Sequence, residues 1–256
     1  MDVDSDSFYI TLPSNASMTL YSANKLSGYS VKLNTPLRLV GNWEVALAEV
    51  SYPNNVFNVV DKASDKVMVV RDSSGNVHPV ELAPGHYNSF EQICERINAR
   101  SSAVGLSFNY MPLTKTIVVK ATNNDAVLYL SFPGRLGLLL GFRPNYIYEI
   151  NGSMESDLVP DITAGIQHYY IYCNICDPQI VGDKYSRLLR ILTRDDSADT
   201  IAQRDYTNLH YLKIAKDKTL SVISVDICTE DGEPVPFSDS GRVIIVLHLR
   251  RRYSEL

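Results

Sequence analysis

The residues best suited to metal chemistry are the two cysteines of the segment CNIC, Cys173 and Cys176. A structural zinc site needs four ligands, and the sequence has neither a second CxxC nor a paired HxxxH to complete one. In a β-strand, residues three apart also point to opposite faces of the sheet. The sequence therefore predicts that both cysteines are thiols of a hydrophobic core.

The other motifs that could do chemistry are incomplete. The five histidines include no HExxH motif and no paired spacing. Asp2, Asp4 and Asp6 imitate the opening of a calcium loop, but serine stands where that loop requires glycine and proline where it requires glutamate. The glycines of PGRLGLLLGF lack the remainder of a phosphate-binding loop. The sequence therefore predicts no enzyme, with no catalytic, cofactor or metal residues.

Two charged segments are candidates for contacts with a partner. Residues 1–7 are acidic and lack apolar periodicity, so we expect a flexible arm. A run of three arginines closes the final predicted strand, and a solvated strand end is its simpler interpretation; a surface for an anionic partner is the alternative. The candidate contact residues are Asp2, Asp4, Asp6, Arg250, Arg251 and Arg252.

The composition fits a folded protein with a sizeable core. The chain has 256 residues, of which 45% are hydrophobic and 21% charged, and one β-sandwich can reach this length. A formal net charge of −5 argues against nucleic acid as the default partner. The sequence shows no signal-peptide pattern and no run of 18 apolar residues, so neither secretion nor a membrane span is expected. Four scattered cysteines favour a reducing compartment.

Most of the chain alternates apolar and polar residues with the period of a β-strand. In the segment TLSVISVDIC, for example, this period predicts that Ser221, Ile223, Val225 and Ile227 line one face. The expected strands cover residues 8–12, 29–39, 43–50, 67–71, 77–82, 107–110, 116–121, 127–132, 168–175, 187–192, 210–214, 220–229 and 242–250.

One helix is expected at residues 90–100, because Ser89 and Gln92 form a capping box and the apolar residues follow a helical period. The run at 133–142 fits a helical turn ended by Gly141, with a buried strand as the alternative. Residues 143–166 are rich in Asn, Gly, Ser, Asp and Pro. They predict a long surface excursion that marks a seam in the chain.

The pattern predicts an all-β protein, namely a single jelly-roll β-sandwich. Early strands need partners among the late ones, and the double Greek-key winding of a jelly roll pairs first with last. We expect a single domain over residues 1–256. An inserted or extended region at about 83–166 would carry the short helix.

Five segments of the chain resemble a known family. They are FYITLPSN, WEVALAEVSYPNNVFN, PGHYNSFEQICERIN, LGLLLGF and SVDICTEDGEPVPFSDSGRVIIVLHLRRR. Together, and in this order, they resemble the penton-type minor capsid proteins of Polinton (Maverick) elements and of related virophage-like or adintovirus-like viruses. The similarity spans nearly the whole chain and includes no catalytic fingerprint.

This resemblance implies a viral structural protein that is made in the host cell and located at the capsid vertex of the virion. Its implied partners are copies of itself, in a homopentamer, and a double-jelly-roll major capsid protein. From the motifs, hydropathy and charge, we expect no cofactor, no membrane span and no specific nucleic acid as partner. The family supplies no active-site residues to transfer to this sequence.

Two alternatives from other classes remain open. A β-sandwich carbohydrate-binding, lectin-like module would present exposed aromatic side chains in a concave site, and the candidates are Tyr146, Tyr148 and the tyrosines of segment 169–172. The 16 tyrosines fit such a surface, a protein interface, or strand propensity alone. A hydrolase on a similar sandwich would need two carboxylates in one cleft.

Overall fold

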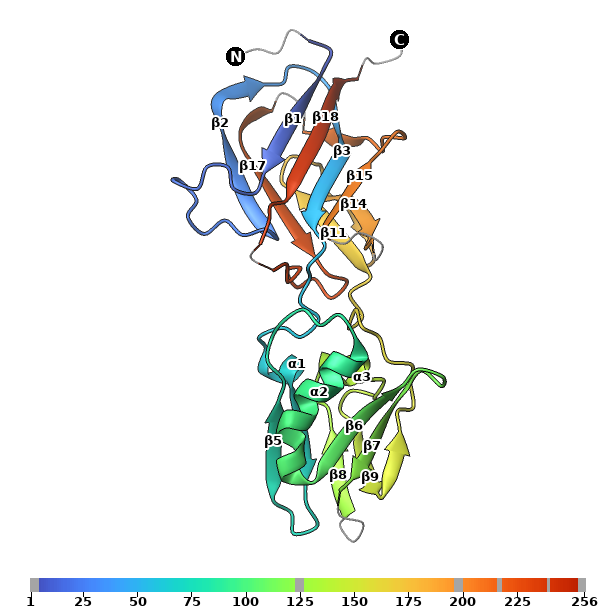
Figure 1. The fold of residues 1–256 in the computed structure, drawn as a ribbon. Coiled ribbons are helices and arrows are strands. Elements are labelled where there is room, and N and C mark those ends of the chain that lie inside the picture. The colour runs from blue at the N-terminus through green and yellow to red at the C-terminus, as the bar shows by residue number, and fades with distance from the viewer. Residues whose placement is uncertain (1–4, 123–126, 196–199, 216–217, 239, 253–256) are drawn as a thin grey trace. The chain divides into compact units, whose positions relative to one another are not determined.

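The computed structural model describes residues 5–122, 127–195, 200–215, 218–238 and 240–252 (Figure 1). The chain forms two compact units. Unit 1 comprises residues 1–56 and 167–256, and unit 2 comprises residues 57–166. We expected the inserted region to begin near residue 83, but unit 2 begins at residue 57. It includes two strands, at residues 67–71 and 77–81, that we expected in the sandwich and that pair with each other in unit 2.

Two antiparallel sheets form the body of unit 1. One has the order β1-β18-β3-β15, with the short strand β16 also pairing with β3, and the other has the order β14-β11-β17-β2 (Figure 1). Their strands are β1 (Ser7–Pro13), β2 (Gly28–Arg38), β3 (Trp43–Pro53), β11 (His168–Cys173), β14 (Leu188–Thr193), β15 (Ile201–Asp205), β16 (Leu212–Ile214), β17 (Thr219–Cys228) and β18 (Ile244–Arg251).

The order of these strands is that of a jelly roll. Without β16, the two sheets have eight strands, which can be numbered from one to eight along the chain. In this numbering, the strand order is 1-8-3-6 in one sheet and 5-4-7-2 in the other. This is the double Greek key. The expected pairing of first with last is confirmed, because β1 runs antiparallel to β18 from Ser7 opposite Arg250 to Pro13 opposite Ile244. Unit 2 is inserted between the third and fourth of these strands, β3 and β11.

The core of unit 1 lies between the two sheets. Ile245, Leu247 and Leu249 alternate along β18 and are fully buried, as the strand period requires. Tyr52 of one sheet and Tyr169 of the other meet edge to face with ring centroids 5.4 Å apart. Such aromatic pairs contribute about 0.5–1.5 kcal/mol beyond the burial of their surface.

The expected alignment of one face of β17 is correct for all but Ser221. Ile223, Val225 and Ile227 are buried, whereas Ser221 is exposed. The pairing of β17 with β2 shifts register between Leu220 and Val222. This irregularity reverses the orientation of the preceding residues, so that Leu220 rather than Ser221 faces the core.

Unit 2 has its own core between two sheets, β5-β4-β8-β9 and β10-β7-β6. Besides the helix and the helical turn expected from the sequence, its described elements include the short helix α1 and the 3-10 turn η1. Its elements are α1 (Ala63–Lys66), β4 (Val67–Arg71), β5 (Val77–Glu81), α2 (Phe90–Ser101), the 3-10 turn η1 (Ser102–Val104), β6 (Leu106–Met111), β7 (Thr116–Ala121), β8 (Val127–Ser131), α3 (Arg135–Leu140), β9 (Ile147–Asn151) and β10 (Ser153–Glu155).

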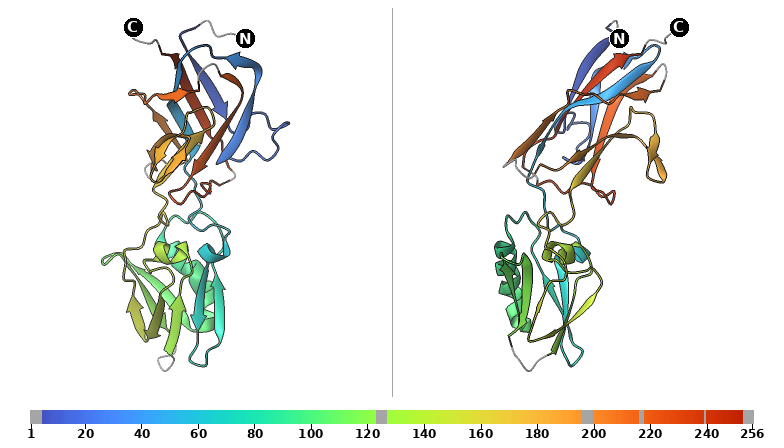
Figure 2. Two further views of the ribbon diagram at one scale, coloured as in Figure 1. Left: turned by 180° about the vertical axis from the view of Figure 1, so that it is seen from behind. Right: turned by 90° about the vertical axis from the view of Figure 1, so that its right-hand side faces the viewer.

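The helix α2 forms where the sequence predicted it. The hydroxyl of Ser89 accepts a hydrogen bond from the Gln92 N–H at 3.2 Å, and the Gln92 side chain accepts one from the Asn88 N–H at 3.0 Å. The buried face of α2 packs toward β6 (Figure 2). There Asn98 donates to the Phe108 carbonyl and accepts from its N–H, which fixes the helix to the strand.

The segments on either side of Gly141 fold differently from each other. The helical turn expected before this glycine is confirmed as α3, and Gly141 ends it in the left-handed conformation with φ 79°. The long surface excursion expected after it is wrong in part. Residues 147–155 form β9 and β10, and β9 buries Tyr148 and Ile150 at 6% and 0% exposure. Strand pairing with β8 overrides the turn-rich composition.

Candidate interaction surfaces

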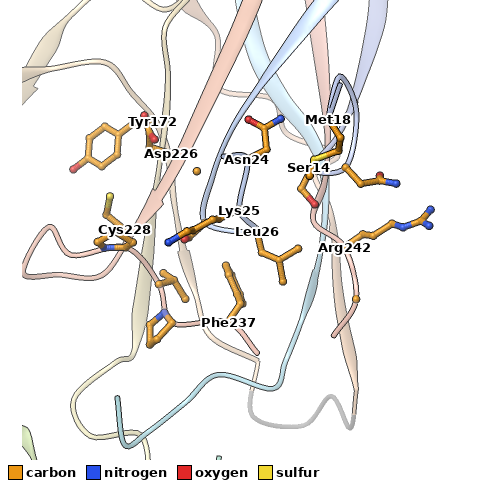
Figure 3. Close-up of a pocket in the computed structure, with 17 residues that line it drawn as sticks. Ser14, Met18, Asn24, Lys25, Leu26, Tyr172, Asp226, Cys228, Phe237 and Arg242 are labelled. Carbon is orange, nitrogen blue, oxygen red and sulfur yellow. The ribbon is translucent and has the colours of Figure 1, made fainter. Parts of the chain in front are cut away.

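A pocket of about 930 Å³ opens on unit 1 (Figure 3). Its walls are the loop between β1 and β2, the connection between β17 and β18, and the ends of β11 and β17. Apolar side chains contribute much of the lining, together with two cations and a carboxylate. These residues include Met18, Leu26, Val235, Phe237, Lys25, Arg242 and Asp226.

The loop that forms one wall of this pocket is held by a side-chain amide. Asn24 accepts a hydrogen bond from the Ser30 N–H at 3.0 Å and donates to the carbonyls of Ala16 and Ser30 at 3.2 and 3.0 Å. Its side chain therefore replaces backbone pairing across the loop. The backbone of Gly28 lies so close to Asp226 that an added Cβ would be 3.2 Å from the carboxylate. The wall is therefore fixed before any partner binds.

The lining of the pocket includes a carboxylate, Asp226, and a thiol, Cys228. Among the described residues that line it, Asp226 is the only carboxylate, whereas a glycosidase needs two. Cys228 also lines the pocket, but burial raises the pKa of its thiol, and the carboxylates of Asp226 and Glu233 raise it further. Because the thiolate is the nucleophile, Cys228 is a weak one at neutral pH.

Two of the predicted contact residues, Asp6 and Arg251, lie close together although they come from opposite ends of the chain. Asp2 and Asp4 are outside the described residues. Asp6 Oδ1 lies 3.8 Å from Arg251 Nη1. Strand β1 begins at Ser7, the last residue of the predicted flexible arm, and not at residue 8 as expected. A role in contacts with a partner stays a prediction for all of these residues.

The arginine run is matched by a carboxylate of the neighbouring strand β3. Arg250 donates to Glu44 Oε2 from Nε at 3.1 Å and from Nη2 at 3.0 Å. Arg252 Nη1 lies 3.7 Å from the other oxygen of Glu44. The carboxylate of Glu44 thus compensates part of the positive charge. The arginine run thus lies beside a carboxylate of its own sheet.

Beside this ion pair, an aromatic cluster covers the outer face of the same sheet. Tyr9 of β1 packs against His248 with ring centroids 4.5 Å apart and ring planes tilted by 35°, and Tyr211 Oη lies 2.7 Å from His248 Nδ1. The Arg250 guanidinium lies over the Tyr211 ring at 3.5 Å. Burial lowers the pKa of His248, and the charge of Arg250 lowers it further.

His248→Gln is expected to reduce the acid sensitivity of unit 1. A folded-state pKa below the usual 6.5 means that the unfolded chain binds the proton more readily. Stability is therefore lost as pH falls from about 7 through 6.5 toward the folded pKa. Urea unfolding at pH 7 and pH 5 should show a smaller loss for His248→Gln than for the wild type. An equal loss in both proteins would contradict this expectation.

The two cysteines of CNIC are core thiols, as predicted. Cys173 and Cys176 are buried at 1% and 0% exposure, and all four cysteines of the chain are free. The expectation that they point to opposite faces is wrong, because β11 ends at Cys173 and a turn follows. The Cys176 N–H donates to the Cys173 carbonyl at 3.3 Å, and the two thiols are hydrogen-bonded. Among the described residues, no group of three or more His, Cys, Asp or Glu side chains could hold a metal ion.

The tyrosines proposed for a carbohydrate site are divided between the two units and differ in exposure. Tyr148 lies in unit 2 and Tyr169 in unit 1, and both are buried, at 6% and 0% exposure. Tyr148 donates a hydrogen bond to Asp157 at 2.9 Å and accepts one from the Arg143 N–H at 2.8 Å. Tyr146 is exposed, but its ring packs against Tyr148. Tyr148 and Tyr169 thus serve the cores of their own units. Tyr170 and Tyr172 point to the other face of β11 and are half-buried, and Tyr172 lines the pocket of unit 1.

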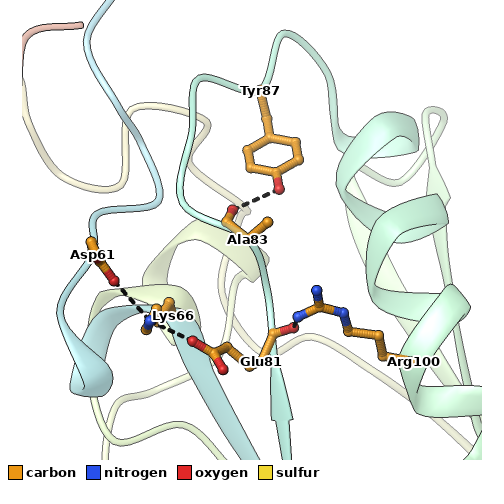
Figure 4. Close-up of polar contacts among 6 residues, drawn as sticks. All are labelled: Asp61, Lys66, Glu81, Ala83, Tyr87 and Arg100. Atoms are coloured by element: carbon orange, nitrogen blue, oxygen red, sulfur yellow. Dashed lines mark hydrogen bonds and ion pairs between the residues drawn. The ribbon is translucent and has the colours of Figure 1, made fainter. Parts of the chain in front are cut away.

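Unit 2 carries a polar network at the ends of β4, β5 and α2 (Figure 4). Lys66 Nζ lies 2.7 Å from Asp61 Oδ1 and also pairs with Glu81, and these two hydrogen bonds raise the pKa of Lys66. Arg100 donates to the Glu81 carbonyl. The Tyr87 hydroxyl donates at 2.7 Å to the carbonyl four residues earlier. The network joins these segments of unit 2. The carboxylates of Asp61 and Glu81 compensate the single positive charge of Lys66.

A hairpin between β11 and β14 was not predicted from the sequence. Its strands are β12 (Gln179–Val181) and β13 (Lys184–Ser186), and they form a separate two-stranded sheet. A signal was present, because Gly182-Asp183 is a two-residue turn between short alternating segments. The segments are three residues each, which is too short for periodicity to mark them as strands.

The similarity of the chain to known proteins lies in its structure. No protein-family model and no curated protein sequence matches the chain. Among solved structures, it is similar to the crystal structure of the mavirus penton protein, with a TM-score of 0.54 and 11% sequence identity. The two chains share a fold. The match covers 96% of this chain and 99% of the mavirus chain, so it includes both units.

Within the described residues, no helix is long and apolar enough to cross a membrane.

Proposed function

We propose that this chain is a penton-type minor capsid protein, located at the vertices of a virion and without enzymatic activity. The observation that carries the proposal is the likeness to the mavirus penton protein over nearly the full length of both chains. The jelly-roll order of the strands in unit 1 supports it independently of that comparison. The resemblance of the sequence segments to Polinton and virophage-like proteins narrows the proposed origin.

The chain would assemble as a homopentamer and contact a double-jelly-roll major capsid protein. A subunit of this kind needs a rigid body and surfaces that fit other subunits, and head-to-tail contacts around a rotation axis close into a ring. Unit 1 supplies a two-layered body with a preformed pocket and a projecting hairpin. Cofactors and nucleic acid have no part in this function.

Native mass spectrometry of the purified full chain tests the proposal. We expect a species with five times the 28.6 kDa mass of the chain, and electron microscopy should show five-fold rings. Mixing the chain with its candidate shell protein should place these rings at vertices. A monomer at every concentration and salt condition would count against the proposal. A monomer with glycan affinity would favour the carbohydrate-binding alternative.

A further inference from the structure

The hairpin β12–β13 exposes an apolar pair that the fold of the subunit does not explain. Ile180 and Tyr185 lie directly opposite each other on its two strands. Their exposed fractions are 68% and 77%. Directly paired side chains stabilise a sheet, but a lone two-stranded hairpin is marginal in water. Adjacent exposed apolar side chains on such an element indicate a contact with another molecule.

The base of this hairpin is fixed to unit 1. Arg187 Nη1 donates to the carbonyls of Asn174 and Cys176 at 2.8 and 2.9 Å. Gln179 Nε2 donates to the Leu188 carbonyl at 2.5 Å. The hairpin is therefore held in one position while its tip stands clear of the two sheets (Figure 2). A prearranged element loses little conformational entropy on binding, which favours its use as a contact.

The tip of the hairpin carries opposite charges beside the apolar pair. Gly182 takes φ 61° at the first position of the two-residue turn, which suits a type II′ hairpin. Asp183 and Lys184 follow it and are exposed. The tip thus presents two apolar side chains, one anion and one cation within six residues.

The pocket of unit 1 has the matching chemistry. Its lining combines apolar side chains with two exposed cations, Lys25 and Arg242, and one exposed carboxylate, Asp226. The cations suit Asp183, and the carboxylate suits Lys184. The volume of about 930 Å³ is at the upper end of the range of about 300–1,000 Å³ that holds a drug-sized ligand, so it can take two side chains.

We infer that the hairpin of one copy inserts Ile180 and Tyr185 into the pocket of a neighbouring copy of this chain. The hairpin residues are not among those that line the pocket of the same copy. Donor and acceptor are thus two different surfaces of one rigid unit, and such a heterologous contact builds rings or open chains rather than two-fold dimers. The inference rests on the proposed function and assigns the interface that would hold the copies together.

A native cysteine makes this contact measurable in the full chain. Cys228 lines the pocket and is half-buried, whereas Cys94, Cys173 and Cys176 are buried. Lys184→Cys places a second thiol at the hairpin tip; it removes the tip cation but leaves Asp183 and both apolar side chains intact. A short bismaleimide, which joins two nearby thiols, is applied at mildly alkaline pH because the raised pKa of Cys228 keeps its thiol protonated at neutral pH. It should then link neighbouring copies into a ladder of covalent oligomers up to the full ring.

Two control variants make the crosslink specific. Lys184→Cys combined with Cys228→Ser should lose the ladder. Leu113→Cys introduces a thiol in unit 2 at a position that is 98% exposed, and it should give at least tenfold less crosslinked product. If oligomers form and the Lys184→Cys ladder does not exceed the Leu113→Cys background, the inference is overturned while the proposed function stands.

The double variant Ile180→Ser, Tyr185→Ser gives a second measurement that does not depend on crosslinking. Both side chains are exposed, so we expect an unchanged thermal unfolding midpoint. The concentration at which oligomers form should rise at least tenfold. Unchanged assembly of this variant would overturn the inference. A wild-type chain that is monomeric under all conditions would instead overturn the proposed function together with it.

Discussion

Gly141→Ala is expected to destabilise unit 2 by about 4 kcal/mol or more, which is large for a single substitution. Gly141 ends α3 with φ 79°, where an alanine costs about 1–2 kcal/mol. The added Cβ would also lie 2.4 Å from the Leu158 carbonyl oxygen and 3.0 Å from the Pro160 nitrogen. Both contacts are with backbone, so relief of the clash requires the connection from α3 to residue 166 to move.

Hydrogen exchange of the full chain, followed by mass spectrometry, can localise this effect. Peptides from residues 57–166 should lose protection, while peptides from unit 1 keep it. Gly152→Ala is the matched control, because Gly152 has φ 77° but no atom within 4 Å of an added Cβ. Gly152→Ala should destabilise unit 2 only by the cost of the left-handed backbone conformation, about 1–2 kcal/mol. Equal effects of the two substitutions would show that the close approach at Gly141 is not the cause.

The parts of the fold that the sequence predicted correctly depend on local signals. The capping box at Ser89 places the start of α2, and Gly141 places the end of α3, because each acts on its own helix. The pairing of early with late strands followed from the small number of ways in which a two-sheet sandwich can cover its edges.

The errors arise where distant residues decide the outcome. The segments at 67–71 and 77–81 have an ordinary strand period, and nothing in that period tells whether they pair with the sandwich or with β8 of unit 2. The insertion was therefore placed too late in the chain. The irregularity at Ser221 depends likewise on its partner strand β2.

The candidate surfaces were less predictable than the fold. Arg250 and Glu44 are 206 positions apart, so their ion pair follows only from the adjacency of β18 and β3. The pocket combines the β1–β2 loop with the β17–β18 connection, and a jelly roll brings these together through its winding. The sequence shows which residues of each segment are charged, but not which charged residues of different segments come into contact.

The second large effect concerns β18, which lies between β1 and β3. Ile245→Ala is expected to destabilise unit 1 by about 2–5 kcal/mol, the range for truncating a buried isoleucine. Ile245 is fully buried and lies opposite Leu12 of β1 and Val50 of β3, which are also buried. The cavity would therefore open where three strands from distant parts of the chain meet. Trp43, the only tryptophan, is buried in β3 and reports this unfolding by fluorescence.

Ile244→Ala provides a control of identical chemistry. Ile244 is the preceding residue of β18, points to the opposite face and is only half-buried. Its truncation should cost about 1 kcal/mol or less, within the span of strand propensities. If the urea midpoint of the Trp43 transition moves equally for both variants, β18 does not bury the face assigned to it. A large difference between the two would support the burial of the Ile245 face of β18 in the core between the two sheets, because only a strand covered on one face has such asymmetry.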